Sequence, residues 1–169
     1  VYGQMQDYYS MRAPSNNLGG GGIHPALWTS TAGCETGWNI PDPVTPDIVW
    51  GGCYAGVVER HDAKTGHTRT VSIWPERTMG APANAIKLRM NWTYPIAISP
   101  HDHDTVYVGS QFVHRTTDAG QTWQAIAVGL KRPGLDLDRS QFRAGQEVRV
   151  RVVATNGLQR SVVMSETVR

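Results

Sequence analysis

The sequence predicts an all-β protein built from about two four-stranded units and a C-terminal β-hairpin. Short runs rich in β-branched and aromatic residues alternate with Gly, Pro, Asn and Asp clusters, which is the pattern of strands and turns. One order of four strands occurs twice, and an Asn-Gly pair near the end is flanked by strand-like runs. The composition agrees, since 18 Gly and 10 Pro in 169 residues indicate many turns.

The first four-stranded unit is expected within residues 23–75. Its strands are predicted at 33–40, 47–52, 56–60 and 69–74. Residues 41–46 form a proline-punctuated turn between the first two strands. Residues 61–66 form the turn between the last two strands.

The second unit, within residues 76–128, repeats this order after a loop at 76–87. Its strands are predicted at 95–99, 105–110, 112–115 and 124–128. The turn at residues 100–104 takes the place that residues 41–46 hold in the first unit. Two copies of one unit at nearly the same period indicate repeats that stack on each other.

The turn between the last two strands of the second unit carries its own stabilising groups. Asp118 can accept backbone N–H groups in an Asx-type turn, and Gly120 supplies a positive φ. The hydroxyls of Thr116 and Thr122 can bond across the turn. Trp123 then opens the next strand and buries a large apolar face beside the hairpin.

This pattern, S/T-x-D-x-G-x-T-W, resembles the Asp-box, or bacterial neuraminidase repeat. All five constrained positions are filled, by Thr116, Asp118, Gly120, Thr122 and Trp123. The box joins the outer strands of propeller blades in sialidases, xyloglucanase-type glycosidases and sortilin-type proteins, away from the active site. The resemblance implies that residues 1–130 hold about two blades of an incomplete β-propeller in a secreted, periplasmic or cell-surface protein.

The N-terminal residues 1–22 contain a four-glycine run that lacks the Gly-Lys-Ser/Thr ending of a phosphate-binding loop. The stretch from Gly3 to Asp7 resembles the Gly-x-Gln-Asp-Asn-Gly turn of bacterial sortilin-like repeats, with Tyr8 and Tyr9 in place of Asn-Gly. The chain shows neither a start Met nor a signal peptide. Because a propeller needs four to eight blades to close, we expect the chain to be a piece of a longer protein.

The C-terminal residues 139–169 are predicted to form a β-hairpin after a linker at 131–138. Residues 147–152 alternate apolar and charged side chains, Asn156-Gly157 makes the turn, and residues 161–165 return. The segment resembles the end of an immunoglobulin-like or fibronectin-like sandwich. The alternative is that it adds strands to the propeller, because a lone hairpin is marginal in water and must pack on something.

The two cysteines are candidates for a disulfide. If residues 41–46 are the centre of a hairpin, Cys34 and Cys53 lie opposite each other on paired strands, close enough for a bridge. The alternative is two free, buried thiols, which behave as small apolar groups. Neither cysteine has a His or Asn at a recognisable spacing, so a catalytic cysteine is not favoured.

Metal and cofactor binding are not predicted. His101-Asp102-His103-Asp104 offers imidazole and carboxylate groups of the kind that bind metals. However, Pro100 opens this segment, and the segment fills the place of a turn. A solvated turn is therefore favoured.

The candidate ligand-binding residues centre on Glu35 and Trp92. Glu35, in a Gly-x-Glu-x-Gly context, resembles an acidic position that faces the central channel of related propellers. Trp92, beside Arg89, is expected to face the same channel. The predicted ligand-binding set is Gln6, Glu35, Tyr54, Arg89 and Trp92.

Glycoside hydrolysis needs a pair of carboxyl groups, for which Glu35 and Asp7 are the candidates. Xyloglucanase-type enzymes carry a catalytic aspartate in an Arg-Thr-Asp-Val-Gly-Gly motif, and the corresponding stretch here has Tyr54 instead. We therefore expect a non-catalytic module that binds carbohydrate or peptide. The alternatives are a fragment of a glycoside hydrolase and a truncated product without independent function.

Other partner classes are disfavoured by charge and hydropathy. A net charge of +2 without a Lys/Arg block does not indicate a nucleic-acid surface. The sequence contains no run of 18 apolar residues, so it does not indicate a membrane span. Because an incomplete propeller leaves open sheet edges, self-association or pairing with the remaining blades is expected.

Overall fold

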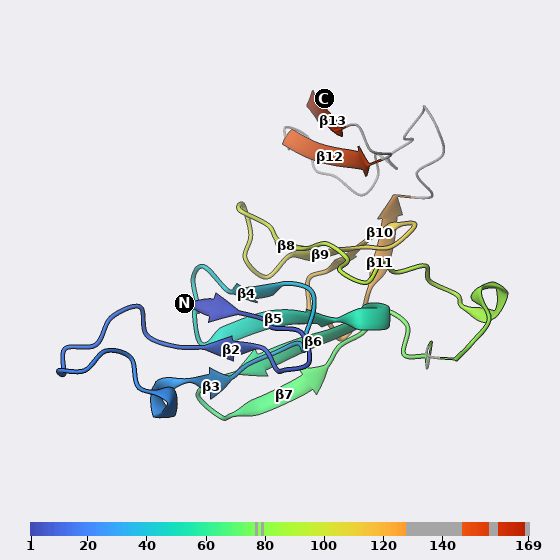
Figure 1. Ribbon diagram of the computed structural model, residues 1–169. Helices are drawn as coiled ribbons and strands as arrows, with labels where there is room; N and C mark the ends of the chain where they lie inside the picture. Colours follow the sequence, from blue (N-terminus) through green and yellow to red (C-terminus); the bar gives the residue numbers. More distant parts are fainter. Residues whose placement is uncertain (77, 79, 128–146, 156–158, 168–169) are drawn as a thin grey trace. The chain divides into compact units, whose positions relative to one another are not determined.

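The computed structural model describes residues 1–76, 78, 80–127, 147–155 and 159–167 (Figure 1). The protein is all-β: every strand pairing is antiparallel, and the described residues contain short 3-10 turns but no α-helix. The chain divides into two compact units, residues 1–135 and 136–169. The predicted linker at 131–138 lies outside the described residues.

Two four-stranded sheets form most of the first unit. The first contains β4 (Asn39–Pro41), β5 (Ile48–Cys53), β6 (Val57–Asp62) and β7 (His67–Thr70). The second contains β8 (Ile96–Ile98), β9 (Val106–Gly109), β10 (Val113–Thr116) and β11 (Gln124–Ala127). In both sheets, strands adjacent in sequence are adjacent in space. The two predicted four-strand units are therefore confirmed.

The first sheet differs from the prediction at its edges. β4 begins at Asn39 rather than at residue 33, because the chain bends at residues 35–37. β6 runs to Asp62, whose Oδ1 accepts the Lys64 N–H and starts the turn there. The fourth strand accordingly begins at His67 and ends at Thr70, not at residue 74.

A third, three-stranded sheet precedes these two and was not predicted. It consists of β1 (Tyr2–Gly3), β2 (Met11–Arg12) and β3 (Thr29–Ser30), in that order. Strands of two residues are too short to show an alternating pattern. The turn expected from the Gly3–Asp7 stretch is present between β1 and β2, with Asp7 at φ 61.

The two four-stranded sheets share one apolar core. Its buried members are Trp50, Val58, Val71, Tyr94, Ile96, Val106 and Val108. Alternation explains Val106 and Val108, since every second residue of β9 points inward. Burying a side chain of this kind contributes about 1.5–3 kcal/mol. The core is thus the main source of the free energy that holds the sheets together.

The turn at residues 116–123 is built as its sequence predicts. The Asp118 carboxylate accepts the Thr122 hydroxyl at 2.6 Å, the Thr122 N–H at 2.9 Å and the Thr116 hydroxyl at 2.7 Å. These hydrogen bonds, led by that from the Thr122 side chain, lower the pKa of Asp118 to about 2. Gly120 has φ +81 and donates its N–H to Thr116 Oγ1. The carboxylate therefore organises the whole turn.

The same turn also docks on the first sheet. Trp123 Nε1 donates to the Val71 carbonyl at 2.8 Å, and its ring meets Trp50 edge-on, with centroids 6.5 Å apart. A Cβ on Gly120 would lie 2.6 Å from Val71 Cβ. Arg69 donates to the Ala119 carbonyl. The turn is thus a contact between the two sheets.

A second contact joins the turns at residues 42–47 and 99–105. The Asp42 side chain is buried and accepts the Val44 and Thr45 N–H groups through Oδ1. Its Oδ2 lies 3.0 Å from His103 Nδ1. The Asp42 hydrogen bond raises the pKa of His103. Burial works to raise the pKa of Asp42, but the hydrogen bonds from His103, Thr45 and Val44 outweigh it and lower the pKa.

The second unit contains the predicted hairpin. Strands β12 (Glu147–Thr155) and β13 (Gln159–Thr167) pair antiparallel from Glu147↔Thr167 to Thr155↔Gln159. Among the described residues they form a sheet of two strands. The predicted Asn156-Gly157 turn lies outside the described residues.

Replacing Gly120 by Ala tests the contact of the 116–123 turn with Val71. We expect Gly120→Ala to lower the free energy of unfolding by about 1–3 kcal/mol more than Gly66→Ala, because only the first adds an overpacked methyl group. Both glycines have positive φ, and a Cβ at Gly66 meets nothing within 4 Å. Urea denaturation of both variants gives the comparison. Equal losses would mean that Val71 does not pack on the turn.

The Asp42–His103 pair makes stability depend on pH. The raised pKa of His103 stabilises the fold fully below the ordinary histidine pKa of about 6.5, and this contribution disappears as the pH rises through the raised value. The lowered pKa of Asp42 stabilises the fold above about pH 3.9, and this contribution disappears as the pH falls through the lowered value. The pair therefore contributes most between these limits.

We expect the parent Tm to fall, relative to that of His103→Gln, as the pH is raised from 6 to 8. Charges facing His103 include Asp102 and Asp104 as well as Asp42. His101→Gln, an exposed change in the same turn, is the control and should keep the parent profile. Parallel Tm curves for the parent and His103→Gln would contradict the assignment.

Candidate functional site

An aromatic pocket of about 330 Å³ opens at the end of the first sheet. One wall is the turn after β5, with Tyr54 and Ala55. The other is the segment between the two four-stranded sheets. This segment contributes Thr78, Ala83, Ile86, Leu88, Arg89, Met90 and Trp92. The pocket therefore lies between two parts of the chain that are distant in sequence.

Local backbone geometry brings the two walls together. The 3-10 turn η2 (Tyr54–Gly56) follows β5 directly, and Gly56 has φ +81. A Cβ on Gly56 would lie 2.7 Å from Met90 Cγ, so a glycine allows Met90 to pack against the turn. The buried Tyr94 hydroxyl donates to the Val57 carbonyl, and burial raises the pKa of Tyr94. The segment is thereby held against the sheet on both sides of Trp92.

The rim of the aromatic pocket carries a stacked aromatic pair. The rings of Tyr54 and Trp92 are 5.0 Å apart and inclined by 15°. Trp92 is nevertheless 61% exposed, so part of this large ring faces solvent. Arg89 is exposed beside it and is the one charged residue among the described residues that line the pocket. The pocket thus combines an accessible aromatic surface with a cationic donor.

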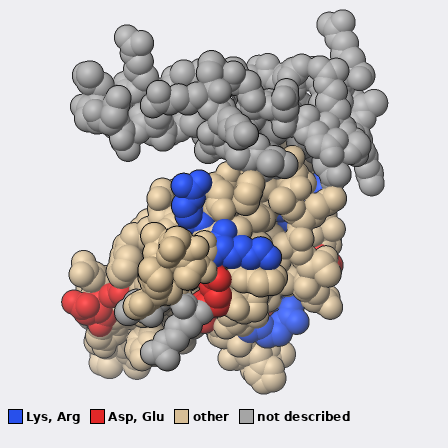
Figure 2. All heavy atoms as spheres, turned by 90° about the vertical axis from the view of Figure 1, so that its right-hand side faces the viewer, with Lys and Arg blue, Asp and Glu red and all other residues tan. Residues whose placement is uncertain are grey.

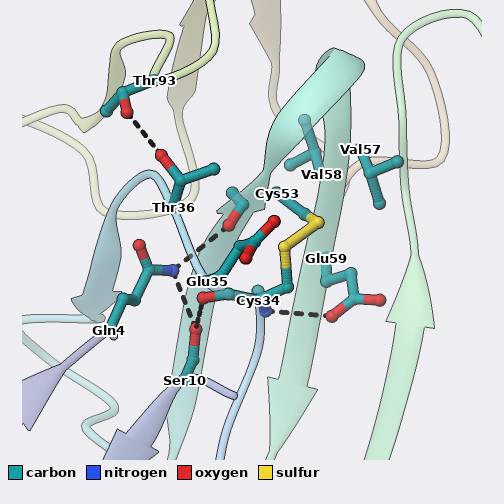
Figure 3. The surroundings of a disulfide bond; sticks show 12 residues. Gln4, Ser10, Cys34, Glu35, Thr36, Cys53, Val57, Val58, Glu59 and Thr93 are labelled. Carbon is teal, nitrogen blue, oxygen red and sulfur yellow. Dashed lines mark hydrogen bonds between the residues drawn. A yellow bond between two sulfur atoms is a disulfide. The ribbon is translucent and has the colours of Figure 1, made fainter. Parts of the chain in front are cut away.

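A second group of functional candidates, the Glu35 cluster, consists of Gln4, Asp7, Ser10 and Glu35. Glu35 Oε2 accepts the backbone N–H of Asp7 at 2.9 Å. Gln4 Nε2 donates to Ser10 Oγ at 2.8 Å, and Ser10 Oγ donates to the Cys34 carbonyl (Figure 3). Gln4 Oε1 is buried and has no hydrogen-bond partner among the described residues. The cluster ties the β1–β2 turn to the segment before β4.

A disulfide joins Cys34 and Cys53, with their Cα atoms 4.9 Å apart (Figure 3). The bridge is present, but the prediction that both cysteines lie on paired strands is wrong. β4 and β5 pair with Ile40 opposite Trp50, and Cys34 lies before β4 rather than on it. Cys34 instead approaches β5 through its own N–H, which donates to the Gly52 carbonyl at 3.3 Å. The bend at residues 35–37 makes up the difference in register.

The Glu35 cluster and the aromatic pocket are connected through residues that neighbour each of them in sequence. The hydroxyls of Thr36 and Thr93 are hydrogen-bonded, which joins the residue after Glu35 to the residue after Trp92 (Figure 3). The disulfide adds a second connection, because Cys53 precedes Tyr54. The two groups are therefore linked parts of the same first unit.

The five predicted ligand-binding residues divide between these places. Tyr54, Arg89 and Trp92 line the aromatic pocket. Glu35 belongs to its own cluster, and Gln6 is exposed in the β1–β2 turn. The candidate catalytic residues Glu35 and Asp7 do meet, but through the Asp7 backbone N–H.

Sequence reasoning missed the apolar part of the pocket. Ile86, Leu88 and Met90 alternate in a segment that was predicted to be partly loop. This alternation was the available signal, since every second residue of an extended segment faces the same side. The segment forms no strand in the structure, so the pattern marks a buried face without regular pairing.

The residues 101–104 form the solvated turn that was favoured. Asp102 accepts the Asp104 N–H and the Thr105 hydroxyl, and His103 contacts Asp42. Within the described residues, no group of three or more His, Cys, Asp or Glu side chains is placed to hold a metal ion. No helix in the same part of the chain is long and apolar enough to cross a membrane.

Charged residues are dispersed over the described part of the face shown in Figure 2. In Figure 2, Lys and Arg form separate groups with Asp and Glu between them, and most of this face is uncharged. A nucleic-acid surface would show a continuous basic patch. The described residues of this face show no such continuous patch.

Comparison with known proteins gives no family assignment. The chain matches no protein-family model and no curated protein.

Proposed function

We propose that this chain is a non-catalytic binding module that holds a carbohydrate in the aromatic pocket. The observation that carries the proposal is the Tyr54–Trp92 stack, with Trp92 61% exposed at the rim of the pocket. The stacked rings form a contiguous apolar surface beside a pocket, and exposed apolar patches with polar groups at their edge mark interaction sites. Here the ring is also held in one orientation by its partner, so little conformational entropy is lost on binding.

The chemistry of the pocket suits a sugar ring. The C–H groups on one face of a pyranose pack against an aromatic ring, while its hydroxyls need hydrogen-bond partners. Arg89 supplies donors beside Trp92, and Thr78 supplies a hydroxyl. Ligand sites commonly combine an apolar lining with a few polar groups that fix orientation. A peptide with an apolar side chain is the second ligand class that this lining suits.

The propeller assignment is part of the same proposal. It is supported by two four-stranded meanders and by an Asp-box-like turn between β10 and β11, the last two strands of the second sheet. A secreted or cell-surface location is supported by the disulfide, because such bonds persist in oxidising compartments. We expect further blades, or a second copy of the chain, to complete the ring.

A glycoside hydrolase is less well supported. That chemistry needs two carboxyl groups that flank the scissile bond. Glu35 receives the backbone N–H of Asp7, and neither residue lines the aromatic pocket. The binding module is therefore preferred over the enzyme.

Replacing Trp92 by Ala should weaken glycan binding at least about 10-fold, a loss of about 1.4 kcal/mol. The chain is first screened on immobilised neutral, acidic and amino oligosaccharides and on a peptide library. The affinity of the best glycan is then measured by calorimetry for the parent, Trp92→Ala and Trp28→Ala. Trp28 is 42% exposed and lies outside the aromatic pocket, so its variant should bind like the parent.

Two results would overturn the proposal. One is equal affinity of all three proteins for the same glycan, which would place binding elsewhere. The other is binding of peptides but of no glycan, which would identify the second ligand class.

A further inference from the structure

The turn between β9 and β10 reaches the aromatic pocket through the side chain of Gln111. Gln111 Oε1 accepts the Arg89 backbone N–H at 2.8 Å. Its Nε2 donates to the Lys87 carbonyl at 3.0 Å. The side-chain amide thus satisfies one donor and one acceptor of the same segment, as a neighbouring strand would do.

The turn that presents Gln111 is itself fixed. Ser110 donates its N–H to the Phe112 carbonyl at 2.8 Å, and Phe112 donates its N–H to Ser110 Oγ at 3.0 Å. Ser110 Oγ also lies 2.9 Å from Nε2 of the buried His114. A side chain that projects from a braced turn is a suitable support, because its starting point does not move.

The segment that Gln111 holds is the pocket wall. Leu88 is buried and Met90 packs on the core, so the alternating residues Lys87 and Arg89 face outward. The segment also makes contacts within itself. The Lys87 ammonium lies 3.2 Å from the centroid of the Trp74 ring. The Lys87 N–H also donates to Glu76. Trp74 and Glu76 belong to the same connecting segment as Lys87. Gln111, in contrast, lies in the turn between two strands of the second sheet.

We propose that Gln111 is a positioning residue, which sets the wall formed by Arg89, Met90 and Trp92 and so controls ligand affinity at the aromatic pocket. The effect on affinity rests on the proposed function, but the effect on the wall does not. Without the side-chain amide, the Arg89 N–H and the Lys87 carbonyl turn to water, and the segment is free to shift away from Tyr54. The second sheet thereby acts on a site to which it contributes no lining residue.

The test compares Gln111→Ala and Gln111→Glu with the parent and with the control Gln121→Ala. Gln121 is an exposed glutamine in the same unit, and its side chain bonds only locally, to the Asp118 carbonyl. Glu at position 111 keeps the acceptor for the Arg89 N–H and loses the donor to Lys87. The first readout is hydrogen exchange of the Arg89 amide. The second is the near-ultraviolet circular dichroism of the Tyr54–Trp92 stack.

We expect the Arg89 amide to exchange at least about 10-fold faster in Gln111→Ala, with an intermediate rate in Gln111→Glu and no change in Gln121→Ala. The aromatic signal should fall in the same order. Calorimetry with the best glycan from the screen, or with cellohexaose if none is selected, should show a 5- to 10-fold loss of affinity for Gln111→Ala.

Unchanged Arg89 exchange and an unchanged aromatic signal in Gln111→Ala would overturn the proposal. Faster exchange with a weaker aromatic signal, but unaltered affinity, would overturn the claim that Gln111 controls binding. If no variant and no parent bound any glycan while the exchange and aromatic effects were present, the proposed function would fail and the positioning role would stand.

Discussion

The docking of the 116–123 turn on Val71 is the constraint on which the rest of the first unit depends. The turn belongs to the second sheet, and Val71 follows β7 of the first. Asp118 fixes the turn, Gly120 lets it approach closely, and Trp123 fills the space between the sheets. One local motif thus sets how two sheets meet, because a rigid turn transmits its own geometry to the interface.

The aromatic pocket follows from this arrangement. Its longer wall belongs to the segment that leaves Val71 and enters β8, so both ends of the wall are fixed by packed sheets. Tyr94 anchors one end through the Val57 carbonyl, and the Glu35 cluster braces the neighbouring rim through Thr36 and Thr93. The middle of the segment lacks strand pairing, and side chains replace it. The wall of the aromatic pocket is therefore fixed at both ends and held by side chains in its middle.

The parts that the sequence predicts well are those fixed by local chemistry. The 116–123 turn and the eight strands of the two large sheets depend on residues close in sequence, so their pattern is readable. The register of β4 and β5 was mistaken, because the turn that joins them is centred later than its prolines suggest, with Pro41 opposite Val49. The bonds of Gln111 to Lys87 and Arg89 join residues more than twenty positions apart, and a single glutamine gives no hint of them.

A double-mutant cycle between Trp50 and Trp123 tests most directly whether the two sheets are held by the turn. Leucine replaces each tryptophan singly and together, and urea denaturation gives the free energy of unfolding of each protein. For edge-on rings at this separation we expect a coupling energy of about 0.5–1.5 kcal/mol. A coupling energy of zero, with additive single effects, would show that the rings do not meet and would contradict this account of the interface.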